Sequence, residues 1–154
     1  MEDVFDCIIV GGGIAGLSAA MVLARNDAQF LLIERGEFIG SKNVSGRVLW
    51  GRDLARLVPE YWTDDPDAIE RYITHRRLTL MDEASAFSLD YKSDAYAEPP
   101  YMGVSVLRSR FDRWLADQVG GHPDTGPMDP GGESGIRYHC ISTSQRRVPW
   151  SWRT

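Results

Sequence analysis

One segment decides how this chain folds: Val4-Phe5-Asp6-Cys7-Ile8-Ile9-Val10-Gly11-Gly12-Gly13-Ile14-Ala15-Gly16. β-Branched and aromatic side chains dominate residues 4–10, and such a run favours a strand that is buried on both faces. The three glycines end that strand. Residues 14–25 hold four alanines, two leucines and a methionine, which are good helix formers, so we predict a buried helix there.

The pattern continues into a β-α-β unit. We expect Asn26-Asp27 to close the helix, because Asn is the non-glycine residue that best tolerates the left-handed conformation of a helix end. Residues 30–33, Phe-Leu-Leu-Ile, indicate a second buried strand. A β-α-β crossover makes its two strands parallel and right-handed. The sequence therefore predicts an α/β fold, the Rossmann-like opening of a doubly wound parallel sheet.

The glycines of this unit fit the pattern GxGxxG in the context that gives the pattern its meaning, after a strand and before a helix. Gly11 would permit the tight turn, Gly13 the approach of a diphosphate to the backbone, and Gly16 the close packing of helix on strand. Backbone N–H groups at the helix start, around Ile14 and Ala15, would bind the diphosphate because the helix dipole favours an anion there. The sequence therefore predicts a dinucleotide site.

An acidic residue is placed to bind the ribose of such a nucleotide. Glu34 ends the second strand, 18 residues after Gly16. Its carboxylate can accept hydrogen bonds from ribose hydroxyls and would repel a 2′-phosphate, which favours FAD or NAD(H) over NADP(H). The competing interpretation is a plain strand-to-helix turn with a solvated glutamate. FAD and NAD both present an ADP group, so these residues do not decide between them.

The middle of the chain predicts smaller elements. Residues 36–45 are polar and contain glycine, which indicates a loop, and a short helix over residues 53–58 is expected to end before Pro59. Two strand-like runs, residues 78–81 and 86–91, flank a polar stretch as the strands of a β-hairpin do. This hairpin would be an insertion in the sheet.

A further strand and helix follow the hairpin. Alternating apolar residues predict a strand over residues 102–106. Ser109-Arg110-Phe111-Asp112 is typical of a capping box, in which a serine caps the helix and an acidic residue three positions later bonds back to it. Phe111, Leu115 and Val119 would form the apolar stripe of that helix.

Composition excludes several classes of protein. A chain of 154 residues suits a single compact domain, and its formal charge of −5 gives no basic face for nucleic acid. The two cysteines, Cys7 and Cys140, are too few for a disulfide framework or a cysteine-rich metal site. The start has no basic region of a signal peptide and no apolar run approaches the length of a transmembrane segment, so we expect a cytoplasmic protein.

The chain resembles the FixC family of flavoproteins, relatives of electron-transfer-flavoprotein:quinone oxidoreductases and geranylgeranyl reductases. The resemblance covers residues 3–119. Two of the passages that carry it are shared widely among FAD-binding proteins, and two are narrower and point to FixC. They are Phe5-Asp6-Cys7-Ile8-Ile9-Val10-Gly11-Gly12-Gly13-Ile14-Ala15-Gly16, Leu32-Ile33-Glu34-Arg35-Gly36, Gly40-Ser41-Lys42-Asn43-Val44-Ser45-Gly46 and Ser105-Val106-Leu107-Arg108-Ser109-Arg110-Phe111-Asp112-Arg113-Trp114-Leu115.

This resemblance implies an FAD cofactor and electron transfer from an electron-transfer flavoprotein toward a quinone, with contact at the membrane surface open for the full-length relatives. Gly11, Gly13, Gly16 and Glu34 would hold the ADP half of FAD. Further residues would lie along the FAD by the same resemblance: Arg35, Lys42, Asn43, Ser45 and Arg108. Alternatively, Arg35 and Lys42 are solvated cations on the surface. The alternative for Arg108 is that it fixes the chain at the start of the next helix.

Three functions remain open from the sequence: a FixC-type oxidoreductase, a geranylgeranyl-reductase-like FAD enzyme, and a non-catalytic nucleotide-binding module or inactive remnant. We nominate no catalytic side chain and no metal ligand, because the flavin ring itself performs the redox step in such enzymes. His75 is interpreted as a surface histidine and Cys7 as a small buried hydrophobe.

The end of the chain departs from the family. Residues 120–154 hold six of the 15 glycines and four of the eight prolines, which indicates an irregular tail after a partial FAD-binding domain over residues 1–119. We expect the sheet to be incomplete and predict marginal stability with a poor or absent flavin complex. A shifted reading frame would explain the tail and predicts family-like sequence in an adjacent frame from about codon 120. Arg47 also stands where relatives commonly have a second glycine.

Overall fold

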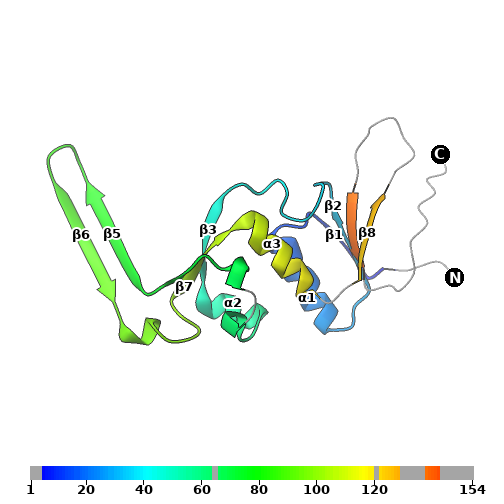
Figure 1. Cartoon of the computed structure of the whole chain (residues 1–154), viewed down its shortest axis with the longest axis horizontal. Coiled ribbons are helices and arrows are strands. Elements are labelled where there is room, and N and C mark those ends of the chain that lie inside the picture. Colours follow the sequence, from blue (N-terminus) through cyan, green and yellow to red (C-terminus); the bar gives the residue numbers. More distant parts are fainter. Residues whose placement is uncertain (1–4, 64–65, 120–121, 129–137, 143–154) are drawn as a thin grey trace. The chain divides into compact units, whose positions relative to one another are not determined.

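The computed structural model describes residues 5–63, 66–119, 122–128 and 138–142. The chain divides into two compact units, one made of residues 1–45 with 108–154 and the other of residues 46–107. Figure 1 shows the elements of both units along the chain. Each unit is described by itself.

The first unit contains the predicted β-α-β opening. Strand β1 (Cys7–Val10) leads through the glycine turn into helix α1 (Ile14–Arg25), and strand β2 (Phe30–Glu34) follows. The two strands are parallel, with Cys7 opposite Phe30 and Val10 opposite Ile33. The helix and both strands therefore confirm the prediction, and the Rossmann-like class is the fold of this unit.

The two strands differ in burial. Phe30, Leu31 and Leu32 of β2 are buried, because this strand has a neighbour on each side. Strand β1 lies at the edge of the described sheet, and its Ile8 and Val10 are 57% and 84% exposed. The prediction that β1 is buried on both faces is therefore wrong for the described part of the chain.

Helix α1 is partly buried, and a residue in the left-handed conformation follows its end. Leu17, Ala20 and Met21 are its buried residues, so one face rather than the whole helix is covered. The left-handed residue is Asp27, with φ of 55°, whereas Asn26 keeps a negative φ of −106°. Asp shares with Asn a short polar side chain that tolerates this conformation. The predicted helix end is right, and the predicted residue is off by one.

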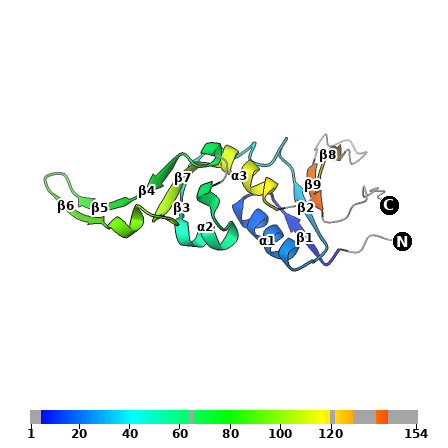
Figure 2. The ribbon, with the colours of Figure 1, turned by 60° about the horizontal axis from the view of Figure 1, so that its bottom comes forward.

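Two strands from residues 122–142 join the described sheet, in the order β1-β2-β9-β8. Strand β9 (Tyr138–Ser142) pairs antiparallel with β2, and β8 (His122–Met128) pairs antiparallel with β9 (Figure 2). An irregular tail was expected here, and it is wrong for these residues. The free edge of β2 presents backbone N–H and C=O groups that need partners, and β9, which contains no glycine, supplies them.

Helix α3 (Arg108–Asp117) packs against α1 in the same unit. Its predicted stripe is confirmed, since Phe111 and Leu115 are 0% exposed and Val119, just beyond the helix, is 3% exposed. The predicted capping box is wrong. The helix begins at Arg108, one residue before Ser109, and the Asp112 carboxylate bonds to Arg108 instead of returning to Ser109.

The second unit is built on a three-stranded antiparallel sheet in the order β3-β7-β4. Strand β3 (Gly46–Trp50) pairs with β7 (Gly103–Leu107), which also pairs with β4 (Arg71–Ile73). Arg47 lies within β3, opposite Val106. The predicted strand over residues 102–106 is thereby confirmed with a shift of one residue.

Short helices and a hairpin complete this unit. Helix α2 (Gly51–Leu57) begins two residues before its predicted start and ends before Pro59. The hairpin is confirmed and is longer than predicted, with β5 (His75–Met81) paired antiparallel to β6 (Ala86–Lys92). Three short 3₁₀ helices span Tyr61–Thr63, Pro66–Ala68 and Asp94–Tyr96. Among the described residues of both units, no helix has the length and apolar character needed to cross a bilayer.

Candidate nucleotide-binding site

The turn after β1 and the first turn of α1 each require a glycine. Gly11 has a φ of +108°, a conformation that side chains disfavour, and its N–H donates to the Ile33 carbonyl at 2.8 Å. A Cβ atom on Gly16 would lie 2.0 Å from the carbonyl oxygen of Gly11, well inside contact distance. The backbone of the turn and the first turn of the helix therefore touch, as the motif predicts.

Gly13 has a different surrounding. It precedes α1 with φ of −83°, which any residue adopts, and a Cβ atom there would meet only the Arg108 Nη2 atom, at an ordinary 3.5 Å. The first turn of α1 carries no acidic residue, and no side chain caps it. The N–H groups at Ile14 and Ala15 have no partner within a helix, and their dipoles favour an anion. Space and charge at Gly13 thus suit a diphosphate.

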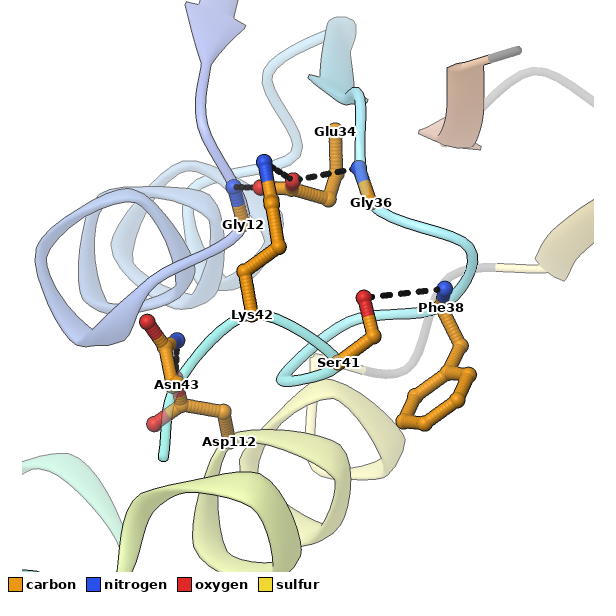
Figure 3. A network of polar contacts seen from close by, with 8 residues as sticks. All are labelled: Gly12, Glu34, Gly36, Phe38, Ser41, Lys42, Asn43 and Asp112. Carbon is orange, nitrogen blue, oxygen red and sulfur yellow. Dashed lines mark hydrogen bonds and ion pairs between the residues drawn. The ribbon is translucent and has the colours of Figure 1, made fainter. Parts of the chain in front are cut away.

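Glu34 lies beside this turn, at the end of β2, with an exposed fraction of only 9%. Its Oε2 atom accepts the Gly12 N–H at 2.8 Å, and its Oε1 atom accepts the Gly36 N–H at 2.6 Å. The ammonium of Lys42 lies 2.7 Å from Oε1 (Figure 3). The carboxylate is therefore held between the glycine turn on one side and the loop after β2 on the other.

These contacts determine the ionisation of Glu34. Burial alone raises the pKa of the carboxyl, but the hydrogen bonds from Lys42, Gly12 and Gly36 outweigh that effect and hold the pKa below its ordinary value. Glu34 is thus an anion at neutral pH. An anion with fixed orientation is what a hydrogen-bond acceptor for ribose hydroxyls requires.

The loop that carries Lys42 is anchored on α3. Gly40 has a φ of +90°, and a Cβ atom there would lie 2.7 Å from the Ser109 carbonyl oxygen, so the loop backbone approaches the helix closely. The Asn43 side chain donates to the Asp112 carboxylate, and the Ser45 carbonyl accepts the Arg108 N–H at 3.1 Å. The loop therefore follows the start of α3 on both sides of Lys42.

Arg108 and Asp112 form the centre of this anchor. The Arg108 guanidinium binds both carboxylate oxygens of Asp112, with Nε and Nη2 each at 2.8 Å, and Asp112 is 0% exposed. These hydrogen bonds raise the pKa of Arg108, whose charge is thereby secured. Arg108 thus fixes the start of α3, and it also lies beside Gly13. The two interpretations of this residue are compatible.

The structure brings most of the predicted site residues together: Gly11, Gly13, Ile14, Ala15, Gly16, Glu34, Lys42, Asn43, Ser45 and Arg108 all belong to the first unit, around one turn and one loop. Arg35, the residue after β2, is exposed. Asp112 was not predicted as a site residue. Its spacing of four residues from Arg108 on a helix is the signal that reveals it.

Two residues set aside from the sequence lie elsewhere. His75 is exposed on β5 and contacts Asp90 across the hairpin. Cys7 is a free thiol, half-buried on β1. Across the described ranges, no group of three or more His, Cys, Asp or Glu side chains is arranged to hold a metal ion.

Comparison with protein families decides what this arrangement belongs to. The family model for FAD dependent oxidoreductases matches residues 6–123. This chain belongs to that family. Among FAD dependent oxidoreductases it is similar to protein FixC of Escherichia coli strain K12, with 48% identity over 118 residues. Protein FixC of Azotobacter vinelandii is 40% identical over 115 residues, and that of Azorhizobium caulinodans is 37% identical over 119. The predicted resemblance to FixC is confirmed.

The FAD dependent oxidoreductase fold is also recognisable in a solved structure, a geranylgeranyl bacteriochlorophyll reductase-like protein of Thermoplasma acidophilum. The TM-score is 0.58 at 25% identity, and the match covers 77% of this chain and 28% of that one. The matched part likewise spans 27% of the Escherichia coli FixC protein. The chain therefore corresponds to about a quarter of its relatives.

Proposed function

We propose that this chain binds the ADP half of FAD and represents the N-terminal part of a FixC-type flavoprotein oxidoreductase. The observation that carries the proposal is the contrast between Gly16, which packs against protein backbone, and Gly13, whose missing side chain leaves space at the start of α1. A glycine that the packing does not require, at a helix start without acidic side chains, is what the approach of a diphosphate explains.

The residues present fit the cofactor. Backbone N–H groups after Gly13 would receive the diphosphate, Glu34 would accept the ribose hydroxyls, and the cations of Lys42 and Arg108 lie beside that turn. Asn43 and Ser45 would act indirectly, since their contacts hold the loop on α3. When FAD is bound, its isoalloxazine ring accepts and donates electrons, while the protein binds and orients it.

The electron partners follow from the FixC resemblance. We propose that electrons pass from an electron-transfer flavoprotein toward a quinone, in a cytoplasmic protein whose full-length form contacts the membrane surface. The 48% identity to FixC supports this assignment. A chimaera in which residues 6–119 replace the aligned part of Escherichia coli FixC tests it: flavin in the purified chimaera that is reduced by the electron-transfer flavoprotein supports the proposal, and a flavin-free chimaera contradicts it.

A second candidate is a geranylgeranyl-reductase-like FAD enzyme. The structural similarity to the geranylgeranyl bacteriochlorophyll reductase-like protein favours it, at 25% identity. The same FAD site would serve both functions, and the higher identity to FixC favours the first. Once the flavin of the chimaera has been reduced, its reoxidation by an isoprenoid double bond, and by no quinone, would reverse that order.

A measurement of ADP binding distinguishes an FAD site from the same fold without nucleotide affinity. We expect the purified chain to bind ADP in a calorimetric titration, and Gly13→Ala to weaken that binding at least about tenfold, because the methyl group occupies the space of the diphosphate. Yellow protein with flavin absorbance would support the enzyme, colourless protein that binds ADP would favour a non-catalytic nucleotide-binding module, and protein that binds neither would be an inactive remnant.

A further inference from the structure

The carboxylate of Glu34, on which the proposed ribose contact rests, already receives three donors from the protein (Figure 3). Its Oε2 atom accepts the Gly12 N–H, and its Oε1 atom accepts both the Gly36 N–H and the Lys42 ammonium. A carboxylate offers about four acceptor positions. Two ribose hydroxyls that donate to this carboxylate therefore need more positions than remain.

Only one of the three donors can leave without disrupting the fold. The N–H of Gly12 belongs to a buried residue, and a Cβ atom there would lie 3.1 Å from Ile39 Cγ1 and 3.2 Å from Glu34 Cβ, so the backbone at Gly12 is packed against these side chains. Gly36 is buried as well, two residues after Glu34. The side chain of Lys42 is 48% exposed, and its ammonium is carried on a flexible four-carbon stem. Lys42 is the donor that can change its partner.

The backbone around Lys42 stays in place when its side chain moves. On one side, the Ser41 N–H donates to the Phe38 carbonyl at 3.0 Å. On the other side, the Asn43 N–H donates to the Gly40 carbonyl at 2.9 Å, and the Asn43 side chain binds Asp112. The movement of the ammonium is thus a change of rotamer and needs no rearrangement of the loop.

A phosphate group is the partner to which the ammonium can turn. Glu34 joins Lys42 on one oxygen to Gly12 on the other, and Gly12 immediately precedes the diphosphate position at Gly13. The Glu34 carboxylate therefore contacts both the Lys42 ammonium and the residue next to the proposed diphosphate position. An ammonium that leaves a carboxylate for a phosphate exchanges one charge-assisted hydrogen bond for another.

We propose that Lys42 pairs with Glu34 in the absence of nucleotide and transfers to the phosphates of a bound nucleotide, so that it selects for ligands that carry phosphate. This inference rests on the proposed ADP site and adds a specificity-determining residue to it. A nucleoside such as adenosine must displace the ammonium from Glu34 and offers it no new anion. ADP displaces the same contact and replaces it.

Substitution of Lys42 has opposite effects on the two ligands under this proposal. In Lys42→Met, adenosine no longer competes with the ammonium, and we expect its affinity to rise about threefold. ADP loses an ion pair, and we expect its affinity to fall about fivefold, the scale of a half-exposed charge pair. The ratio of the two affinities therefore falls about fifteenfold. Lys42→Arg keeps the cation and should restore most of the wild-type ratio.

Isothermal titration of each variant with ADP and with adenosine measures these affinities. Lys92→Met on β6 is the matched control, because it removes an exposed lysine by the same substitution in the other unit, and both affinities should stay at the wild-type values. Shifts of ADP and adenosine in the same direction, or no shift in Lys42→Met, overturn the role of Lys42 while leaving the ADP site intact. Absence of ADP binding by the wild type overturns the proposed function and this inference with it.

Discussion

Gly16 packs so closely on Gly11 that a methyl group on Gly16 would lie 2.0 Å from the Gly11 carbonyl oxygen. Gly16 and Gly13, two glycines of the same motif, therefore have different roles. Gly16 is required by the packing of helix on turn, whereas Gly13 has an ordinary φ of −83° and room for a Cβ atom. The motif therefore combines Gly16, which the fold requires, with Gly13, which the fold would allow to be replaced.

The two alanine substitutions should therefore separate. Gly16→Ala places a methyl group against backbone that cannot yield, and we expect a loss of at least about 3 kcal/mol in the free energy of unfolding. Gly13→Ala should change that free energy by less than about 1 kcal/mol while it weakens ADP binding. Urea denaturation followed by circular dichroism measures both. Equal stability losses in the two variants would contradict the distinct roles.

The ionisation of Glu34 predicts a pH dependence of stability. Its carboxyl pKa is lowered in the folded state, because the hydrogen bonds from Lys42, Gly12 and Gly36 outweigh the opposing effect of burial. A lowered pKa means that the stabilisation is complete above the unfolded pKa, near 4.5, and is lost as the pH falls through the folded pKa. We expect the free energy of unfolding to fall in acid through this group, and Glu34→Gln to lack that component.

Urea denaturation at a series of pH values from about 3 to 7 tests this dependence. Lys42→Met provides a second reading, because it removes one of the donors that lower the pKa of Glu34. In that variant the folded pKa moves toward the unfolded one, so the acid loss should be smaller than in the wild type and complete at a higher pH. The interpretation fails when Glu34→Gln and the wild type lose stability in parallel as the pH falls.

Much of the first unit follows from short-range pattern. The strand, turn and helix from Cys7 to Arg25 and the acid at Glu34 are encoded within a few tens of residues, where periodicity and glycine positions are informative. The partners of Glu34 were not predicted. Gly12 and Gly36 act through backbone N–H groups, which no side-chain pattern reveals, and Lys42 reaches the carboxylate through the fold of its loop.

The remaining differences have tertiary causes. Ser109 and Asp112 satisfy the local pattern of a capping box, yet Asp112 forms stronger charged contacts with Arg108 and a hydrogen bond with Asn43, which is 69 residues away. Strand β9 forms on the edge of β2 because an open edge attracts any backbone that can pair. Asn43 and β9 are long-range partners, which override local propensity and which a single sequence does not display.

The buried carboxylate of Asp112 should be among the most sensitive side chains of the first unit. Its removal in Asp112→Ala leaves the Arg108 guanidinium, whose side chain is 16% exposed, without its partner and releases Asn43. Breaking a buried pair in this way costs about 3–5 kcal/mol. The measurement is the free energy of unfolding from urea denaturation.

Asp117→Ala is the control for Asp112→Ala. Asp117 is exposed at the end of the same helix, where an acidic side chain opposes the helix dipole, so its removal should be neutral or stabilising by a few tenths of a kcal/mol. Comparable losses in the two variants would show that the Arg108–Asp112–Asn43 contacts contribute little to the fold.

Tyr61 predicts an alkaline transition in the second unit. It is 1% exposed, its hydroxyl donates to the Pro100 carbonyl, and burial, followed by the nearby Tyr72 and Tyr101 hydroxyls, raises its pKa to about 12. A raised pKa means that the stabilisation is complete below the unfolded pKa of 10 and is lost as the pH rises toward 12. Two pKa units correspond to about 3 kcal/mol.

Tyr61→Phe removes this alkaline loss and leaves the Pro100 carbonyl without that donor, so at neutral pH we expect it to cost about 1 kcal/mol. Tyr91→Phe is the control, because Tyr91 is 54% exposed and its substitution should change the neutral stability by less than about 0.5 kcal/mol. Ultraviolet titration of the phenolate band compares the wild type with Tyr61→Phe. A wild-type protein in which every tyrosine ionises by pH 11, with the fold retained, would contradict the burial of this hydroxyl, because a folded-state pKa of about 12 keeps one tyrosine protonated at that pH.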